Sequence, residues 1–290
     1  MKEDTSCFVE TACGLVRVVP RKCPLCGADN IHTPTNEQLS SPPWRVISCR
    51  NCGFTHLHQA PLYDALYSTL AWEKTTRLEE QRRSEIRPFS YPISKATRFR
   101  MGLLPRRKVA DMVNGQARPG PVLDLGCGDG HHLLTLNSEY IPYGIEISAA
   151  IAARAAEALA TRGGQAINAS CLEGITHFPD KFFTAAILRS YLEHELKPAE
   201  VLKALHRVLQ PEGTLFIKVP NFGCWQRNLM GVRWCGFRFP DHVNYFTAST
   251  LKSMGEMCGY QVRFGVLDRL PTSDSLYATM IRKSPPRQLP

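Results

Sequence analysis

The chain has 290 residues, 43% hydrophobic content and a net charge of +9, which suits a folded protein with a sizeable core rather than a disordered chain. It contains no run of 18 apolar residues and it starts with polar and acidic residues, so we expect neither a membrane span nor a signal peptide and predict a cytoplasmic protein. Eleven cysteines, an odd count in a chain this long, favour reduced thiols over a disulfide framework.

Two cysteine knuckles follow an irregular lead-in of residues 1–22. The segments CPLCG and CRNCG supply two C-x-x-C pairs, each followed by glycine, with the thiols of Cys23, Cys26, Cys49 and Cys52. Four thiolates at this spacing can close a tetrahedron around Zn²⁺, so residues 1–60 are predicted to hold a structural zinc ribbon; the alternative is four buried cysteines without a metal. Because four thiolates leave no vacancy for a further ligand, three nearby histidines are expected at the surface: His32, His56 and His58.

Residues 61–100 are predicted to form a basic helical linker. Between residues 69 and 118 the sequence carries twelve Lys or Arg against five acids, a local charge of +7. A solvated helical face explains this pattern most simply, since Glu79 can pair with Arg82 and Arg83. An anionic substrate is the alternative.

A catalytic domain is predicted over residues 101–290, where apolar runs of strand length alternate with helical patterns. This alternation indicates parallel β-α-β units and an α/β fold. The predicted strands are 121–126, 143–147, 165–170, 184–190, 214–220, 262–268 and 277–283. The predicted helices are 105–115, 131–138, 149–161, 198–209 and 247–258, the last capped by Thr247 or Ser249.

A glycine-rich turn follows the first strand of this domain. In PVLDLGCGDGHHL, Asp124 ends the strand and three glycines alternate after it: Gly126, Gly128 and Gly130. Glycine is needed where the backbone turns sharply and a ligand approaches it, and the next helix would present free N–H groups to a carboxylate. Glu146 ends the second strand, eighteen residues after Gly128, where a carboxylate can accept both hydroxyls of a ribose.

These motifs resemble the class I S-adenosylmethionine-dependent methyltransferases over residues 101–283, including the block from the fourth to the fifth strand with its RVL-x-P-x-G turn. The resemblance implies a Rossmann-like, seven-stranded, mostly parallel sheet that binds S-adenosylmethionine. It assigns the methionine part of the cofactor to the turn, the ribose to the second strand, the adenine to the third, and the pocket edge to the fourth. The implied residues are Asp124, Gly126, Cys127, Gly128 and Gly130; Glu146 and Ile147; Ser170 and Cys171; and Leu188 and Arg189. At the third strand Ser170 stands where the family often has Asp, which implies a weaker contact with the adenine.

The zinc ribbon ahead of such a domain is similar to that of bacterial methyltransferases of sugar and natural-product pathways, in which it belongs to the substrate side. The sugar C-methyltransferases have a further C-terminal domain after the seventh strand, whereas this sequence stops just past its predicted seventh strand, so the resemblance does not extend to their particular substrate. The resemblance implies a small-molecule acceptor without identifying it.

Candidate catalytic residues occur in two loops. Tyr191 and His194 follow the fourth strand, and Asp241 and His242 lie in a long aromatic stretch that we expect to form a lid over residues 221–246. A histidine with an ordinary pKa suits a general base, and Asp241 could raise the basicity of His242. A packing role is the alternative for both histidines. Arginines on the same stretch would suit an acidic acceptor: Arg227, Arg233 and Arg238.

The predicted function is methyl transfer from S-adenosylmethionine to an oxygen or carbon of a sugar, polyketide or related metabolite. One alternative is an RNA methyltransferase that grips nucleic acid with its ribbon and basic segment. It is disfavoured because ILRSYLEH replaces the N-P-P-Y type tetrapeptide of base methylation, so nucleic acid is not expected as a partner. The other alternative, a non-catalytic assembly or regulatory protein, is disfavoured by the intact Asp124, glycines and Glu146.

Overall fold

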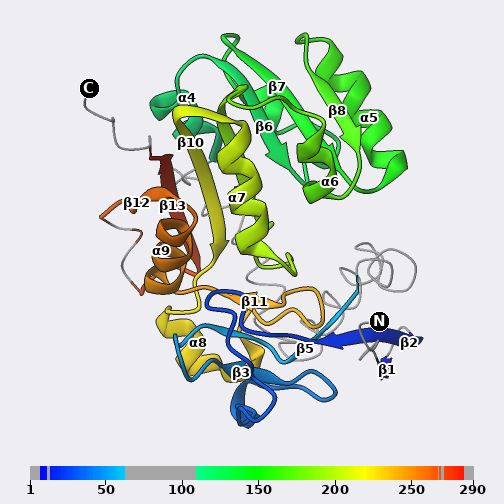
Figure 1. Ribbon diagram of the computed structural model, residues 1–290, viewed down its shortest axis with the longest axis vertical. Coiled ribbons are helices and arrows are strands. Elements are labelled where there is room, and N and C mark those ends of the chain that lie inside the picture. The colour runs from blue at the N-terminus through cyan, green and yellow to red at the C-terminus, as the bar shows by residue number, and fades with distance from the viewer. Residues whose placement is uncertain (1–6, 12–13, 63–108, 267, 269–270, 284–290) are drawn as a thin grey trace, which may run out of the picture.

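The computed structural model in Figure 1 describes residues 7–11, 14–62, 109–266, 268 and 271–283. A large twisted sheet with helices fills one end of the molecule, and the small strands of the N-terminal region gather at the other end with α8 and β11. The predicted basic linker and its start near residue 61 fall almost wholly outside the described residues.

The large sheet has seven strands in the described part of the chain, in the order β12-β13-β10-β9-β6-β7-β8. β6, β7, β8, β9 and β10 pair in parallel, whereas β13 runs antiparallel to both of its neighbours. The strands are β6 (Gly120–Leu125), β7 (Tyr140–Glu146), β8 (Gln165–Asn168), β9 (Phe183–Arg189), β10 (Leu209–Pro220), β12 (Tyr260–Arg263) and β13 (Ser275–Arg282). This confirms the predicted Rossmann-like, mostly parallel sheet, and the carboxyl ends of β6, β7 and β9 meet at one edge, where ligands of such sheets bind.

The helices of this domain are α4 (Val109–Gln116), α5 (Ala149–Ala160), α6 (Cys171–Thr176), α7 (Pro198–Val208), α8 (Trp225–Met230) and α9 (Ala248–Met257). α7 shows why they form: its apolar residues recur on one face, and Val201, Leu202 and Leu205 are fully buried against the sheet. Thr247 caps α9 by accepting a hydrogen bond from the backbone N–H of Thr250, as the sequence predicted.

The helix predicted over 131–138 is wrong. Only the three residues Leu133–Thr135 form a 3-10 turn there. Leu133 and Leu136 are buried and gave the apolar spacing of a helix, but the turn-forming Asn137 and Ser138 follow at once and no second turn forms. The glycine turn therefore has no α-helix N-terminus behind it, and the argument from a helix dipole does not hold.

The predicted irregular lead-in is also wrong for its described part. β1 (Cys7–Thr11) and β2 (Gly14–Pro20) form an antiparallel hairpin, and β5 (Gln59–Pro61) adds to β2. β3 (Val46–Ser48) and β4 (Thr55–Leu57) carry the second knuckle between them. The N-terminal region is thus built from two small sheets around the knuckles.

The predicted lid is joined to the ribbon. β11 (Asn244–Tyr245) pairs antiparallel with β4, so a segment of the catalytic domain is the third strand of a ribbon sheet. The two parts also share one hydrophobic core, in which Trp44 and Val46 of the ribbon pack with Phe222, Trp234 and Phe237 of the lid. The lid is therefore held in place by the ribbon and is not an independent loop.

No helix in the described ranges is long and apolar enough to cross a membrane.

Candidate functional site

The glycine turn lies at the carboxyl end of β6. Gly126, Gly128 and Gly130 all have positive φ, at 69°, 57° and 80°. A side chain is strained in this region of backbone space, which is why the turn needs glycine at these positions. The backbone N–H groups of Gly126 and Cys127 both bond the carbonyl of Ile145 on β7, which fixes the turn against the neighbouring strand.

Glu146 is tied to the same turn. One oxygen of its carboxylate, Oε2, accepts a hydrogen bond from the N–H of Gly128 at 3.1 Å, and the other, Oε1, accepts from the N–H of Ser148 at 2.9 Å. The two residues are eighteen positions apart in sequence and meet at the edge of the sheet. The predicted ribose-binding carboxylate is thus oriented by backbone donors on both sides, and Ile147 follows it, half-buried.

Asp124 is buried at the end of β6. Burial raises the pKa of its carboxyl to about 8, and the nearby charges of Arg189 and Glu146 act on it in opposite directions. The structure therefore brings three sequence-predicted residues, Asp124, Glu146 and Arg189, within electrostatic reach of one another. Carboxyls with a shifted pKa cluster at functional sites, so this edge of the sheet is the candidate ligand site.

The residues expected at the adenine and at the pocket edge differ in how far their side chains are open to a ligand. Ser170 caps α6 by accepting a hydrogen bond from the N–H of Glu173 at 3.4 Å, so its hydroxyl already has a structural partner. Cys171 is buried beside it, and Leu188 is fully buried in the main core, while Arg189 is exposed at the end of β9. Leu188 packs inward, and Arg189 of this pair can reach a ligand.

The turn after β9 approaches the glycine turn. Cδ2 of Tyr191 lies 3.4 Å from the position that a Cβ on Gly126 would occupy. The phenol of Tyr191 donates a short hydrogen bond to the carboxylate of Glu195, and the N–H of His194 bonds the carbonyl of Tyr191 at 2.9 Å. Tyr191 and His194 therefore belong to one turn that touches the predicted cofactor loop.

His194 and His242 meet, as two loops far apart in sequence converge. Their ring centroids lie 4.6 Å apart with the planes at 87°. Nδ1 of His194 bonds the carbonyl of Asp241 at 2.9 Å, and Nδ1 of His242 bonds the carbonyl of Gly236 at 2.8 Å. A carbonyl can only accept, so each neutral ring carries its proton on Nδ1 and its lone pair on Nε2.

Burial and the charge of Arg238 lower the pKa of His194 to about 4, so this ring is neutral at physiological pH. The carboxylate of Asp241 lies 2.9 Å from Nε of Arg238. Arg227 donates from Nε to the carbonyl of Phe222 and covers the ring of that residue. Two of the three lid arginines therefore contact protein groups.

Glu193 is a functional candidate that the sequence reasoning missed. Its carboxylate is 1% exposed and lies with one ring nitrogen each of His194 and His242, all within 4.8 Å of one another. Burial raises its pKa to about 8, against the opposing charges of Lys218 and Arg238. The Glu-His pair in SYLEHE, considered together with His242, was the available signal.

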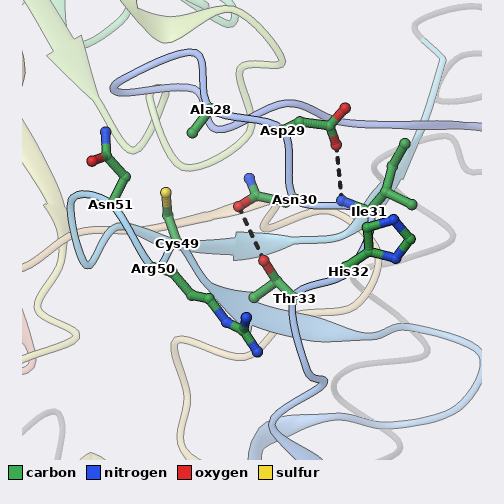
Figure 2. Close-up of a pocket in the computed structure, with 9 residues that line it drawn as sticks. All are labelled: Ala28, Asp29, Asn30, Ile31, His32, Thr33, Cys49, Arg50 and Asn51. Atoms are coloured by element: carbon green, nitrogen blue, oxygen red, sulfur yellow. Dashed lines mark hydrogen bonds between the residues drawn. The ribbon is translucent and has the colours of Figure 1, made fainter.

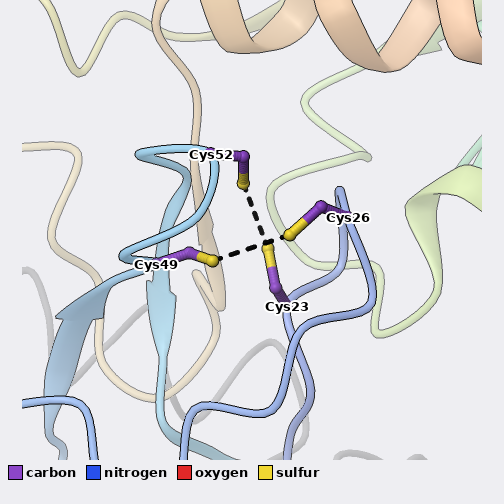
Figure 3. A group of neighbouring side chains, drawn as sticks. All are labelled: Cys23, Cys26, Cys49 and Cys52. Carbon is purple, nitrogen blue, oxygen red and sulfur yellow. Dashed lines mark hydrogen bonds between the residues drawn. The ribbon is translucent and has the colours of Figure 1, made fainter.

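The four ribbon cysteines converge, as Figure 3 shows. The sulfur atoms of Cys23 and Cys52 lie 3.5 Å apart and those of Cys26 and Cys49 lie 3.6 Å apart. Thiolates bound to one tetrahedral Zn²⁺ at about 2.3 Å are separated by about 3.8 Å, so this cluster fits a small zinc site. Burial raises the pKa of Cys52 to about 11 and that of Cys23 further, so a cation is needed to hold these sulfurs as thiolates.

Both knuckles have the backbone that such a site needs. The N–H of Gly27 bonds the carbonyl of Cys23, and the N–H of Gly53 bonds that of Cys49, at 2.9 and 2.8 Å. Gly27 and Gly53 have positive φ, at 74° and 73°. This explains the glycine after each C-x-x-C pair.

His56 corrects a sequence expectation. His32 is exposed and His58 is half-buried, but His56 is fully buried on β4. Its Nε2 lies 3.0 Å from Nδ2 of Asn30, and its Nδ1 bonds the carbonyl of Leu57 at 2.7 Å. Four cysteines complete the coordination of a zinc ion, so no histidine is needed as a ligand. That argument does not decide whether a histidine is exposed, and the ring of His56 is part of the ribbon core.

A small pocket lies between the second knuckle and the segment that follows the first, and residues 28–33 and 49–51 line it (Figure 2). Its polar groups bond one another: the carboxylate of Asp29 accepts from the N–H of Ile31, and the amide oxygen of Asn30 accepts from the hydroxyl of Thr33. It shares no residue with the glycine turn or the histidine pair. We therefore assign it no part in the reaction.

A family model described as a methyltransferase domain matches residues 97–263, more than half of the chain. No curated protein matches the sequence. A SAM-dependent methyltransferase from Methanosarcina mazei is 20% identical, with 59% of this chain and 94% of that chain covered and a TM-score of 0.45. One from Archaeoglobus fulgidus is 16% identical, with 60% and 94% covered and a TM-score of 0.45.

The family match decides which family the chain belongs to. The glycine turn and Glu146, the acid at the end of the second strand, agree with it. The chain belongs to the methyltransferase-domain family and is an S-adenosylmethionine-dependent methyltransferase.

Proposed function

We propose that the protein transfers the methyl group of S-adenosylmethionine to an oxygen or carbon of a small molecule, such as a sugar or a polyketide-type metabolite. The observation that carries this proposal is the contact of Tyr191 with Gly126, because it places the turn that bears His194 beside the predicted cofactor loop. The acceptor would lie between that turn and the lid.

The enclosure of this site supports a small acceptor. His242 is 8% exposed, and the lid that carries it shares its core and a sheet with the ribbon. Methyl transfer from a sulfonium needs an aligned nucleophile and the exclusion of water, which a covered site supplies.

In this proposal the cofactor is held by the glycine turn and by Glu146, with Ile147, Ser170 and Cys171 around its adenosine and Arg189 at the edge of the pocket. Asp124 and Cys127 stand behind the methionine part. Tyr191, His194, Asp241 and His242 form the acceptor side, and the two histidines activate the acceptor. The four cysteines hold a structural Zn²⁺ that stabilises the ribbon and, through β4 and β11, the lid.

Calorimetry with S-adenosylhomocysteine tests the cofactor site. The full chain should bind one equivalent, and Glu146→Gln should weaken binding at least ~10-fold because it removes the charge that accepts the ribose hydroxyls. Glu157→Gln, an exposed change on α5, is the matched control and should bind like the parent. A folded parent that binds no S-adenosylhomocysteine would refute the proposed function.

A further inference from the structure

A second group of potential metal ligands lies on the acceptor side of the site. One carboxylate oxygen of Glu193 and one ring nitrogen each of His194 and His242 lie within 4.8 Å of one another. Two ligands bound to one ion at about 2.1 Å are at most about 4.2 Å apart, so small side-chain shifts bring all three onto a single ion. Two imidazoles and one carboxylate are a known donor set for divalent transition metals.

Both histidines are oriented as metal ligands are. A metal-binding histidine donates its other ring N–H to a carbonyl or carboxylate, which fixes the tautomer and the ring. Here the Nδ1–H of His194 meets the carbonyl of Asp241, and that of His242 meets the carbonyl of Gly236. In this tautomer each neutral ring carries its lone pair on Nε2.

Glu193 supplies an independent observation. Its side chain is 1% exposed, and within the described residues its Oε2 is a buried oxygen without a hydrogen-bond partner. A buried polar atom without a partner is costly, and in native proteins it calls for an explanation such as an ion. The backbone of Glu193 is fixed as well, because its carbonyl accepts from the N–H groups of Val243 and Asn244 beside His242.

Nearby positive charges oppose a cation and have to be weighed. Arg238 and Lys218 both act on Glu193. Arg238, however, lies 2.9 Å from the carboxylate of Asp241, which compensates its charge. When Glu193 is ionised, its charge and that of Asp241 balance the charges of Arg238 and Lys218, so these four groups together carry no net charge.

We infer that Glu193, His194 and His242 bind a divalent transition-metal ion that holds the acceptor oxygen for methyl transfer. The inference rests on the proposed function and deepens it, because it makes the two histidines ligands instead of a general base and its partner. Three protein ligands leave coordination positions open for substrate.

The chemistry balances without a further reactant. A hydroxyl of the acceptor binds the ion and loses its proton to water, since a bound cation lowers the pKa of a coordinated oxygen. The resulting alkoxide attacks the methyl carbon, the O–C bond forms, and the C–S bond breaks with its electron pair going to sulfur. The products are the methyl ether and S-adenosylhomocysteine.

Titration of the full, zinc-loaded chain with Mn²⁺, followed by electron paramagnetic resonance, tests the site without turnover. Mn²⁺ prefers nitrogen and oxygen over thiolates, so the ribbon does not compete for it. The parent should bind one Mn²⁺. Glu193→Gln and His242→Asn should each weaken binding at least ~100-fold, because the loss of a ligand exceeds the 10- to 100-fold effect of removing a supporting partner.

His206→Asn on α7, which packs against Tyr260 away from this cluster, is the matched control and should bind Mn²⁺ like the parent. Binding of S-adenosylhomocysteine by each variant shows that it is folded. The inference is overturned if the parent binds S-adenosylhomocysteine but neither Mn²⁺ nor Co²⁺ beyond the metal of the ribbon, or if both folded variants bind Mn²⁺ as the parent does. Loss of S-adenosylhomocysteine binding by the parent would instead contradict the proposed function.

Discussion

The guanidinium of Arg21 donates a hydrogen bond to Oδ1 of Asn244 at 2.9 Å, across 223 positions of sequence. It also donates to the carbonyls of Val243 and Leu196 at 2.9 Å. One side chain at the end of β2 thus links the ribbon to the lid and to the loop after β9. The histidine pair lies between these two loops, so its geometry depends on Arg21.

Replacing Arg21 by Met should therefore destabilise the protein. The variant keeps much of the apolar length but leaves the partly buried carbonyls of Val243 and Leu196 and the amide of Asn244 without a charged donor, which we expect to cost about 2–4 kcal/mol. Urea unfolding of parent and variant measures this difference. Arg263→Met on β12, where the guanidinium bonds nearby Gln261, should change stability by less than about 0.5 kcal/mol. Equal effects of the two changes would mean that the Arg21 contacts contribute no special stability.

Zinc removal should loosen the lid as well as the ribbon. The parent should contain one zinc per chain, and Cys23→Ser with Cys49→Ser should lose it, because two thiolates cannot complete the tetrahedron. Since Trp44 and Trp234 share a core, the tryptophan fluorescence should shift to the red in this variant. Elemental analysis and fluorescence check the two effects. Cys7→Ser, an exposed change on β1, is the control, and full zinc in the double variant would show that other residues are the ligands.

Local patterns in the sequence predicted the parallel strands well. The run TLFIKVP in β10 is largely buried on both faces of the sheet. Its apolar residues therefore indicated a central strand. The glycine turn and the knuckles were recognisable because positive φ and tetrahedral metal binding each require particular residues at particular spacings.

The features that escaped prediction depend on contacts between distant segments. The pairing of β4 with β11 joins residues about 190 positions apart. β4 has three residues and β11 has two, which is too short for either strand to show an alternation of apolar and polar residues. The burial of His56 follows from that pairing, since Asn244 lies opposite it. Glu193 stood in a turn, where sequence periodicity says nothing about which side chain faces inward.

Nucleic acid should bind weakly. The net charge of +9 attracts any polyanion, so RNA should be retained at low salt through counterion release and lost steeply as the salt concentration rises. We expect no preference among sequences or structures in a mixed RNA pool, since the proposed acceptor site is covered by the lid. Filter binding between 50 and 200 mM salt, roughly the range over which such contacts weaken, checks this. Tight binding of one structured RNA at the upper salt concentration would favour an RNA methyltransferase.

Acid should destabilise the junction of ribbon and lid through His56. Burial, with a smaller contribution from the charge of Arg21, lowers the pKa of His56 to about 3. The unfolded chain has a histidine pKa of about 6.5, so the folded state binds fewer protons between these values. The stability that neutral His56 provides is fully present above pH 6.5 and decreases as the pH falls towards 3, by up to about 1.4 kcal/mol per pH unit.

The variant His56→Gln isolates this contribution. An amide can bond Asn30 and does not titrate, so the variant should be less stable than the parent at pH 7.5 but should lose less stability between pH 6.5 and 5. Between pH 6.5 and 5, few thiolates and carboxylates take up protons. Those that do are the same in parent and variant, so their effect cancels when the two slopes are subtracted. Urea unfolding at several pH values measures both slopes. His32→Gln, an exposed change in the same ribbon, should keep the slope of the parent. Parallel slopes for His56→Gln and the parent would show that His56 has the same pKa in the folded and the unfolded chain, and would contradict this prediction.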